Sequence, residues 1–191
     1  MARPTGRDIR RAVLDEATVA MQSRGVAGFS FGDLASRVGV KAPSIHHHFP
    51  KKHDLVVATI SAYRDHFTDR IAELASGPPF EQLESYCQAF LEPTAKDLLC
   101  LCGAAVAGWD DLDDAAQAQV GAFFDDQVTW VRARLGEADE RGEVRNGVDR
   151  DALAVTIVSA LEGALLMARS STAGEPAVTV ARTMLQLARQ T

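Results

Sequence analysis

Three consecutive histidines, His46, His47 and His48, are the residues in this sequence whose chemistry stands out most. Imidazole is a common zinc ligand, so such a run suggests a metal site. Successive side chains on a helix point about 100° apart, however, and three neighbours therefore cannot all reach one ion. We expect no metal site here, and expect the imidazoles to donate hydrogen bonds or carry positive charge toward a partner.

Cys100 and Cys102 are a second candidate pair, for a redox centre or a thiolate metal site. On a helix, side chains two positions apart face nearly opposite directions, and a free cysteine is usually a small buried apolar residue. With Cys87 the cysteines are odd in number, which does not suit a disulfide framework and favours a reducing cytoplasm. The sequence has no nucleotide-binding glycine loop, nucleophile elbow or metalloprotease motif. We therefore expect neither an enzyme nor a bound cofactor.

The histidine run ends a stretch, residues 30–49, whose pattern predicts two short helices joined by a tight turn. Ser30 is a good N-cap, and Asp33 stands three residues later, where its carboxylate can bond back to the cap. Gly39 follows the first apolar stripe at a position where a residue without Cβ can take a left-handed conformation. Pro43 fits the first turn of the second helix, where its missing N–H has no helical partner.

The second of these helices is expected to have an inner and an outer side. Ile45 and Phe49 are four residues apart and can face the first helix. The residues left on the outer side are Lys41, Ala42, Ser44, His46 and His47. A capped helix, a glycine turn and a second short helix form a helix-turn-helix pattern, whose second helix enters the DNA major groove. An ordinary pair of packed helices is the alternative.

Charge is distributed unevenly along the chain. Residues 1–53 contain nine Lys and Arg against four Asp and Glu, whereas residues 54–191 contain eleven against twenty-two. A basic end on an acidic body is typical of a chain that presents that end to phosphate. Arg7, Arg10 and Arg11 cluster at the start of a first helix expected over residues 7–24, either beside a DNA backbone or as a solvated terminus.

The remaining sequence, rich in alanine and apolar at helical spacing, predicts an all-α fold of about nine helices. After the short pair, helices are expected over residues 54–75, 80–91, 95–109, 115–141, 150–170 and from 174 onward. We expect no apolar segment long enough to span a membrane and no signal peptide, and hence a cytoplasmic protein without a membrane partner.

The last two expected helices carry more apolar residues than solvent-facing helices need. Two helices from each of two copies can form a four-helix interface, which predicts a homodimer. The alternative is that both helices pack inside one subunit.

At this point the stretch SFGDLASRVGV-KAPSIHHHFPKKHDL and the helical body after it resemble the TetR/AcrR family of transcriptional regulators. The resemblance implies an N-terminal three-helix DNA-binding domain, residues 1–53, and a C-terminal effector-binding and dimerisation domain, residues 54–191. It also implies double-stranded DNA with a palindromic operator as partner, and a small effector that releases a repressor. The rival class is a helical-bundle enzyme or small-molecule carrier without specific DNA binding, which needs converging polar groups that we do not find.

The resemblance and the charge pattern together assign roles in the head. Ser30, Lys52 and Arg10 are expected to contact phosphates, while residues of the second short helix face base edges. The expected DNA-binding set is Arg10, Ser30, Lys41, Ala42, Pro43, Ser44, His46, His47 and Lys52. Two departures from the family pattern stand out: Ala42 replaces a frequent lysine, and His46 and His47 replace tyrosines.

Two expectations follow for DNA binding. If His46 and His47 donate to phosphates, affinity should strengthen as pH falls from roughly 7.5 to 6. If Lys52 contacts a phosphate, Lys52→Ala should weaken binding to all sequences and reduce the salt slope by about one.

An effector pocket is expected among the middle helices, with a mostly apolar lining that suits an apolar or aromatic compound. The candidate lining residues are His66, Tyr86, Phe90, Cys102, Val106, Trp109, Phe124 and Trp130. Each of them also fits ordinary core packing.

Overall fold

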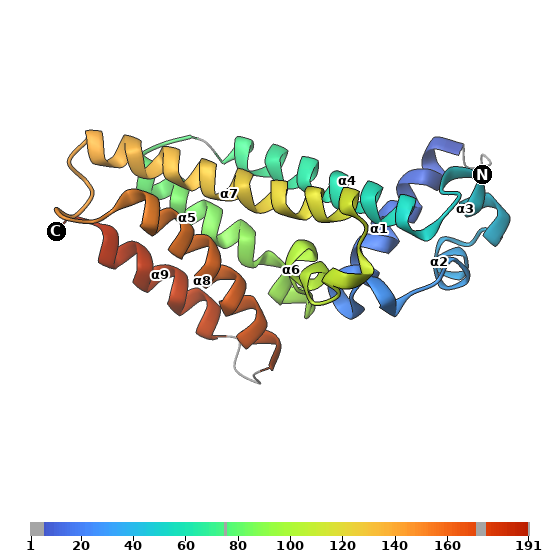
Figure 1. The fold of residues 1–191 in the computed structure, drawn as a ribbon. Coiled ribbons are helices and arrows are strands. Elements are labelled where there is room, and N and C mark those ends of the chain that lie inside the picture. The colour runs from blue at the N-terminus through green and yellow to red at the C-terminus, as the bar shows by residue number, and fades with distance from the viewer. Residues whose placement is uncertain (1–5, 75, 171–174, 191) are drawn as a thin grey trace. The chain divides into compact units, whose positions relative to one another are not determined.

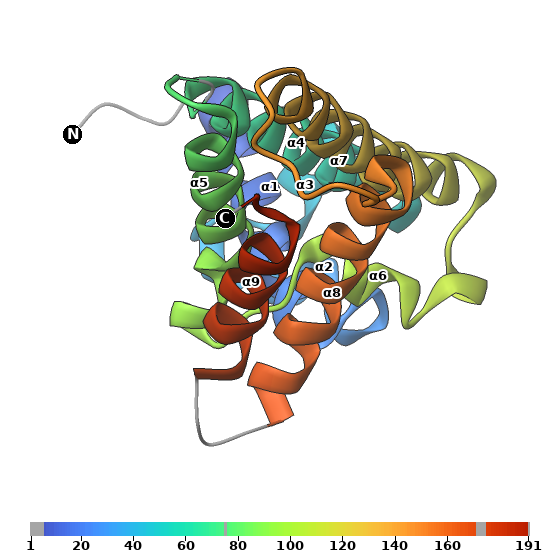
Figure 2. The ribbon, with the colours of Figure 1, turned by 90° about the vertical axis from the view of Figure 1, so that its left-hand side faces the viewer.

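The computed structural model describes residues 6–74, 76–170 and 175–190. Within these ranges the chain is helical apart from turns, loops and one isolated bridge between Val144 and Arg189. The helices, drawn in Figures 1 and 2, are α1 (Gly6–Arg24), α2 (Phe31–Val38), α3 (Ala42–His48), α4 (Lys52–Glu73), α5 (Pro79–Leu91), α6 (Leu101–Val106), α7 (Asp114–Glu140), α8 (Arg150–Ser170) and α9 (Glu175–Ala188). The expected all-α fold is confirmed.

The chain divides into two compact units. The first contains the chain up to His66 together with residues 101–121, and the second contains residues 67–100 and 122 onward. The chain crosses between the units three times, within α4 after residue 66, in the loop before α6 after residue 100, and within α7 after residue 121. The boundary expected between residues 53 and 54 separates a DNA-binding from an effector-binding domain, and it stays a prediction. In the compact units, α6 belongs together with the N-terminal helices.

The turn between α2 and α3 forms as the sequence predicts. The Ser30 hydroxyl accepts a hydrogen bond from the Asp33 backbone N–H, and the Asp33 carboxylate accepts one from the Ser30 backbone N–H. Gly39 ends α2 in the left-handed conformation, at φ 75° and ψ 31°, and its N–H donates to Ala35. Pro43 lies in the first turn of α3, which begins at Ala42.

The core of the first unit forms where α1 packs against α2, α3 and α6. Each helix contributes fully buried apolar side chains, among them Met21 of α1, Leu34 of α2 and Ile45 of α3, all at 0% exposure. Burial of Ile45 fixes the rotation of α3 about its axis, because its side chain can leave the core only if the helix turns. The core therefore determines which side of α3 faces outward.

The second unit is built on α5, α8 and α9. Figure 2 shows α8 and α9 side by side, and α5 packs against both of them. The expectation that no apolar segment is long enough to span a membrane is wrong, because α8 has the length and composition to cross one. Within this unit α8 contributes core residues, since Ile157, Leu161 and Leu165 are almost completely buried.

The prediction of one continuous helix is wrong. Residues 95–109, predicted as a single helix, contain the end of a 3-10 helix (Glu92–Lys96), then α6, then the start of another 3-10 helix (Trp109–Asp111). Asp97 takes a left-handed conformation, at φ 54°, and its N–H donates back to Thr94. A helix cannot continue through that conformation, so the chain restarts at Leu101.

The other helices begin and end within about two residues of the predicted positions, as is usual for helix termini. Ala75 and Gly174, which the predictions placed at helix ends, lie outside the described residues.

Candidate nucleic-acid interface and ligand site

The outer side of α3 presents the residues that the sequence predicts to face DNA. Ile45 and Phe49 are buried, at 0% and 3% exposure. The predicted residues are either exposed (Lys41, Pro43, His46 and His47) or half-buried (Ala42 and Ser44). Small side chains at the start of α3 let its backbone approach a groove closely, and Lys41 places a positive charge directly before the helix.

The start of α2 is a second part of this surface. The Ser30 hydroxyl donates to the Asp33 carboxylate over 2.7 Å, and this bond and the one from the Ser30 backbone N–H lower the pKa of Asp33. The proton of the Ser30 hydroxyl is thus already used inside the cap. The first-turn N–H groups of Phe31 and Gly32 have no intrahelical acceptor, so they are the donors best able to meet a phosphate.

Lys52 holds the segment that leads into α2. Its ammonium group donates to the Phe29 carbonyl oxygen over 2.7 Å and lies 4.5 Å from the centre of the Phe29 ring. Burial lowers the pKa of Lys52, while the charges of Asp111 and Asp33 act in the opposite direction. Lys52 therefore positions the Ser30 cap from inside, and a phosphate contact has to use its remaining N–H bonds.

Arg10 and the histidines lie around the end of α3. The Arg10 guanidinium lies 5.3 Å from the centre of the Phe49 ring, and the rings of His46 and Phe31 are 4.6 Å apart. His47 and His48 are also in edge contact, with ring centres 5.3 Å apart. No three His, Cys, Asp or Glu side chains in the described part of the chain form a group that can hold a metal ion.

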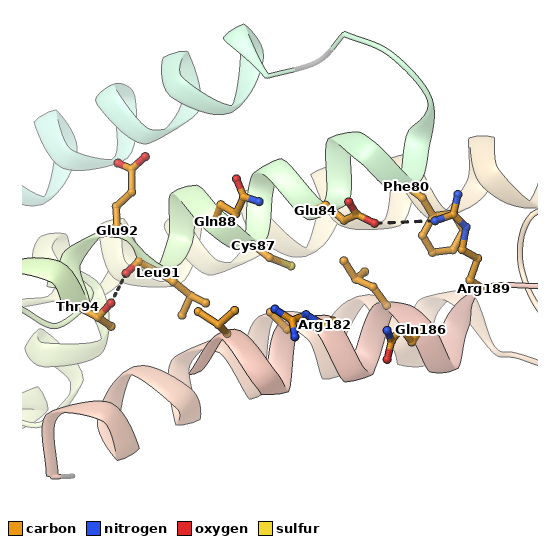
Figure 3. Close-up of a pocket in the computed structure, with 13 residues that line it drawn as sticks. Phe80, Glu84, Cys87, Gln88, Leu91, Glu92, Thr94, Arg182, Gln186 and Arg189 are labelled. Atoms are coloured by element: carbon orange, nitrogen blue, oxygen red, sulfur yellow. Dashed lines mark hydrogen bonds and ion pairs between the residues drawn. The ribbon is translucent and has the colours of Figure 1, made fainter. Parts of the chain in front are cut away.

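A groove of about 530 Å³ runs between α5 and α9 in the second unit. Figure 3 shows Cys87 of α5 and Arg182 of α9 facing the space between the two helices. The guanidinium of Arg189 lies 3.9 Å from the Glu84 carboxylate and 5.2 Å from the centre of the Phe80 ring. Burial raises the pKa of Cys87 to about 12, so its thiol stays protonated and unreactive at neutral pH. None of the residues predicted to line an effector pocket lines this groove.

An aromatic cluster in the same unit joins side chains of α4, α5 and α7. The Tyr86 and Trp130 rings are stacked with centres 5.2 Å apart, and Phe67 contacts Tyr86, Phe90 and Phe123 edge-on at 5.7–6.2 Å. We call these five residues, Phe67, Tyr86, Phe90, Phe123 and Trp130, the aromatic cluster. It brings together three of the predicted pocket residues, Tyr86, Phe90 and Trp130.

The other predicted pocket residues lie elsewhere. Phe124 is half-buried beside Phe123, with ring centres 5.3 Å apart. His66, Cys102, Val106 and Trp109 belong to the first compact unit. Cys102 is fully buried there, whereas Val106 and Trp109 are 46% and 40% exposed.

Several polar atoms are buried beside the aromatic cluster. The Tyr86 hydroxyl, both amide atoms of Gln127 and Glu162 Oε1 make no hydrogen bond within the described ranges. The thiol of Cys100 donates to the Glu162 carboxyl, and the charge of Glu162 acts on the Tyr86 hydroxyl. Burial raises the pKa of Tyr86 well above its ordinary value.

Sequence reasoning missed Gln127 and Glu162, although both interrupt apolar stripes. Gln127 lies one turn from Phe123 and from Val131 on α7, and Glu162 lies at helical spacing from Val158 and Leu165 on α8. A polar residue inside a core-facing stripe is the signal that marks them.

Glu162 makes stability depend on pH. Burial raises the pKa of its carboxyl above the ordinary value of 4.5, and the Cys100 hydrogen bond offsets only part of this. The folded protein then binds this proton more tightly than the unfolded chain, so ionisation destabilises the fold as pH rises through the raised pKa. We expect Glu162→Gln to raise the melting temperature at pH 7, and the difference from the native protein to shrink as pH falls toward 4.5.

Thermal unfolding followed by circular dichroism across this pH range measures the difference. Glu73→Gln, on the exposed side of α4, is the matched control and should change the melting temperature little at any pH. A Glu162→Gln protein that melts below the native protein at pH 7 would show that the ionised carboxylate stabilises the fold.

Comparison with known proteins agrees with this arrangement. The family model described as "Bacterial regulatory proteins, tetR family" matches residues 13–59, and "Tetracyclin repressor-like, C-terminal domain" matches residues 79–184. A TetR-family transcriptional regulator from Agrobacterium tumefaciens is 27% identical with a TM-score of 0.92, over 97% of this chain and 100% of that one.

A TetR transcriptional regulator from Legionella pneumophila is 28% identical with a TM-score of 0.84, over 98% of this chain and 100% of that one. The reduced form of E. coli NemR, at 20% identity, shares the fold with a TM-score of 0.82 over 95% of this chain and 97% of that one. Among proteins with curated descriptions, none matches this chain in sequence.

Proposed function

This chain belongs to the tetR family of bacterial regulatory proteins and is a ligand-responsive, DNA-binding transcriptional regulator, and from this premise we propose that it is a repressor. In the proposed mechanism, α3 enters the major groove of a palindromic operator. A small effector that binds in the second unit then releases the protein from DNA. As a regulator it is expected in the cytoplasm, with no enzyme activity of its own.

The observation that carries this proposal is the orientation of α3. Burial of Ile45 and Phe49 turns Lys41, His46 and His47 outward, and the Ser30 cap holds α2 beside them. Lys41, Pro43, Ser44 and His46 then contact base edges, while the start of α2, Lys52 and Arg10 contact phosphates. A two-fold dimer implies half-sites about 34–36 Å apart, or a multiple of that spacing.

Dimerisation through α8 and α9 is supported by apolar side chains that one subunit leaves in solvent. Leu166, Met167 and Val155 of α8 are 49–57% exposed, and Leu187 of α9 is 60% exposed. Large exposed apolar side chains gathered on two adjacent helices are typical of a protein interface.

We propose that the effector binds in the second unit, which contains the aromatic cluster with its buried polar atoms and the groove between α5 and α9. Drug-sized ligands are bound in most proteins by cavities that combine apolar side chains with a few polar groups. The groove is flanked by charged side chains on both helices.

The direct test of DNA binding is a fluorescence anisotropy titration of the upstream region of the protein's own gene, with unrelated DNA as competitor. We expect an affinity for the operator roughly a thousandfold or more above that for the competitor. Equal affinity for both DNAs at every salt concentration would refute a specific regulator.

A further prediction concerns the exposed imidazoles of His46 and His47. Histidine gains positive charge as pH falls from roughly 7.5 to 6, so operator affinity should increase over that range at constant ionic strength. A double variant, His46→Asn with His47→Asn, keeps hydrogen-bond donors but cannot titrate, and its affinity should change less with pH. The same titration measures both proteins, and parallel pH profiles would exclude the two histidines as the cause.

A further inference from the structure

The groove between α5 and α9 has the size and shape of a binding site for a chain-like molecule. Its volume of about 530 Å³ lies within the range of small-molecule sites in proteins. Figure 3 shows Phe80 toward one end of the groove and Leu91 toward the other. These two residues are eleven positions apart on α5, so the groove is roughly 16 Å long at the rise of an α-helix.

The floor of the groove is apolar along its length. It is lined by Phe80, Cys87 and Leu91 of α5 and by Ala181 and Leu185 of α9, and all five are at most 7% exposed. Cys87 adds no charge, because burial raises the pKa of its thiol to about 12. A long apolar floor between two helices suits an extended alkyl chain better than a compact ring system.

The rim of the groove carries four charged side chains, and three of them are paired. The Glu84 carboxylate lies 3.9 Å from the Arg189 guanidinium, and the Glu92 carboxylate lies 3.0 Å from the guanidinium of Arg70 on α4. Arg182 lies between the two ends of the groove and forms no ion pair with any side chain that the structure describes. The charge that the groove leaves to a ligand is therefore positive.

A guanidinium beside an apolar floor selects a carboxylate with a hydrocarbon tail. The planar guanidinium of Arg182 can bind both oxygens of a carboxylate at once. Gln186 follows Arg182 by one helical turn and also lines the groove, so its amide N–H groups are available to the same carboxylate. The ammonium group of an amine would instead meet Arg182 as a like charge.

The groove and the proposed dimer interface share α9. Val178, Arg182 and Leu185 line the groove at spacings of four and three residues, which places them on one side of the helix. Leu187 lies on the opposite side and is 60% exposed. A molecule in the groove therefore acts on the helix through which two copies are proposed to meet.

We propose that this groove is the effector site and that the effector is a medium-chain carboxylate, whose head group binds Arg182 and whose alkyl chain lies on the apolar floor. Its binding displaces α9 at the dimer interface, and the altered dimer no longer fits the two half-sites of the operator. This inference rests on the proposed function, because it names the position and chemical class of the effector that releases the repressor.

Three compounds with the same alkyl chain and different head groups test the proposal: octanoate, 1-octanol and octylamine. Isothermal titration calorimetry of the native protein without DNA gives their dissociation constants. We expect octanoate to bind at least about tenfold more tightly than the alcohol, and the amine to bind more weakly than the alcohol.

Arg182→Gln should weaken octanoate binding by roughly ten- to a hundredfold and change the binding of the alcohol by no more than about twofold. Arg145→Gln is the matched control, because Arg145 is also exposed and belongs to the same unit but does not line the groove. It should leave the affinity for all three compounds unchanged.

A second variant blocks Arg182 without removing it. Val178 is 52% exposed and lies one helical turn before Arg182, so Val178→Glu places a carboxylate where it can pair with the guanidinium. We expect this variant to bind octanoate about tenfold more weakly or worse, at an unchanged melting temperature. Thr183→Glu adds the same charge next to Arg182 at a position that does not face it, and should change octanoate affinity by no more than about twofold.

Several outcomes would overturn the proposal. Binding of octanol or octylamine as tight as that of octanoate would do so, as would equal losses of octanoate affinity in Arg182→Gln and Arg145→Gln. Octanoate binding that Val178→Glu leaves intact would place the ligand elsewhere. No binding of octanoate up to about 10 mM would exclude a carboxylate site in the protein.

The effect on DNA is measured separately, by fluorescence anisotropy with a labelled operator. Saturating octanoate should lower the operator affinity of the native protein by about tenfold or more, and that of Arg182→Gln much less at the same concentration. Operator affinity that bound octanoate leaves unchanged would refute the effector role and with it this inference. A protein that binds the operator but not octanoate refutes this inference alone, whereas a protein that binds octanoate but not the operator refutes the proposed function.

Discussion

Lys41→Glu should reduce operator affinity by roughly a hundredfold or more at fixed salt. Lys41 immediately precedes α3 and is exposed, and its ammonium group is expected to lie at the mouth of the major groove. The substitution removes an attraction to base edges and phosphates and adds a repulsion in the same place. Fluorescence anisotropy with a labelled operator duplex measures the loss directly.

Lys96→Glu is the matched control for this charge reversal. Lys96 is also exposed, but it lies in the second unit, at the end of the 3-10 helix that follows α5. The two variants have the same net charge. If only the overall charge of the protein mattered, both would therefore lose the same operator affinity. We expect Lys96→Glu to change operator affinity by no more than about threefold. Equal losses in the two variants would contradict a local role for Lys41.

Leu166→Glu combined with Met167→Glu should convert the dimer into a monomer. Both side chains are more than half exposed in one subunit, at 56% and 57%, so the fold of the subunit does not depend on them. In the proposed interface they are buried against the partner copy, where two carboxylates per subunit have no partner and cost several kcal/mol, about 5 or more. Light scattering after size exclusion measures the mass, and circular dichroism checks that the helices are intact.

The monomer should also lose operator affinity, because two half-sites are no longer bound together. Val19→Glu places a carboxylate on another exposed apolar residue, on α1, and should leave the dimer intact. If the double variant remained dimeric, or if the native protein were a monomer at micromolar concentration, α8 and α9 would not form the interface.

The helix-turn-helix was predictable because its determinants are local. A serine cap with an acid three residues later, a glycine at a left-handed position and a proline in the first turn each act within one helical turn. The structure contains all three, at Ser30, Gly39 and Pro43. The burial of Ile45 and Phe49 also followed from their spacing, since the four-residue repeat defines one side of a helix.

The aromatic cluster was harder to predict because its contacts join distant parts of the chain. Tyr86 meets Trp130 and Phe67 meets Phe123 only after folding, and no local pattern pairs them. Gln127 and Glu162 were overlooked because the expected pocket residues were chosen mainly among aromatic and apolar side chains, although the positions of both inside apolar stripes are visible in the sequence. The apolar lining expected for an effector pocket stays a prediction.

The broken helix after α5 shows a second limit of periodicity. Residues 95–109 have a helical composition, but the left-handed conformation at Asp97 depends on the hydrogen bonds of Asp97 and Leu98 back to Thr94 and Pro93. Helix propensity differs by less than about 1 kcal/mol between most residues, so a few such bonds determine where a helix stops. The resulting α6 packs on α1 within the first unit.

Hydroxyl-radical footprinting of the DNA upstream of the protein's own gene tests most directly whether the outer side of α3 reads an operator as part of a dimer. The native protein should protect two half-sites related by a two-fold axis, with centres one helical turn or a multiple apart. The protection should disappear with Lys41→Glu and persist with Lys96→Glu. Uniform protection at low salt without paired half-sites would contradict operator reading by α3, and so would an unchanged protection pattern with Lys41→Glu.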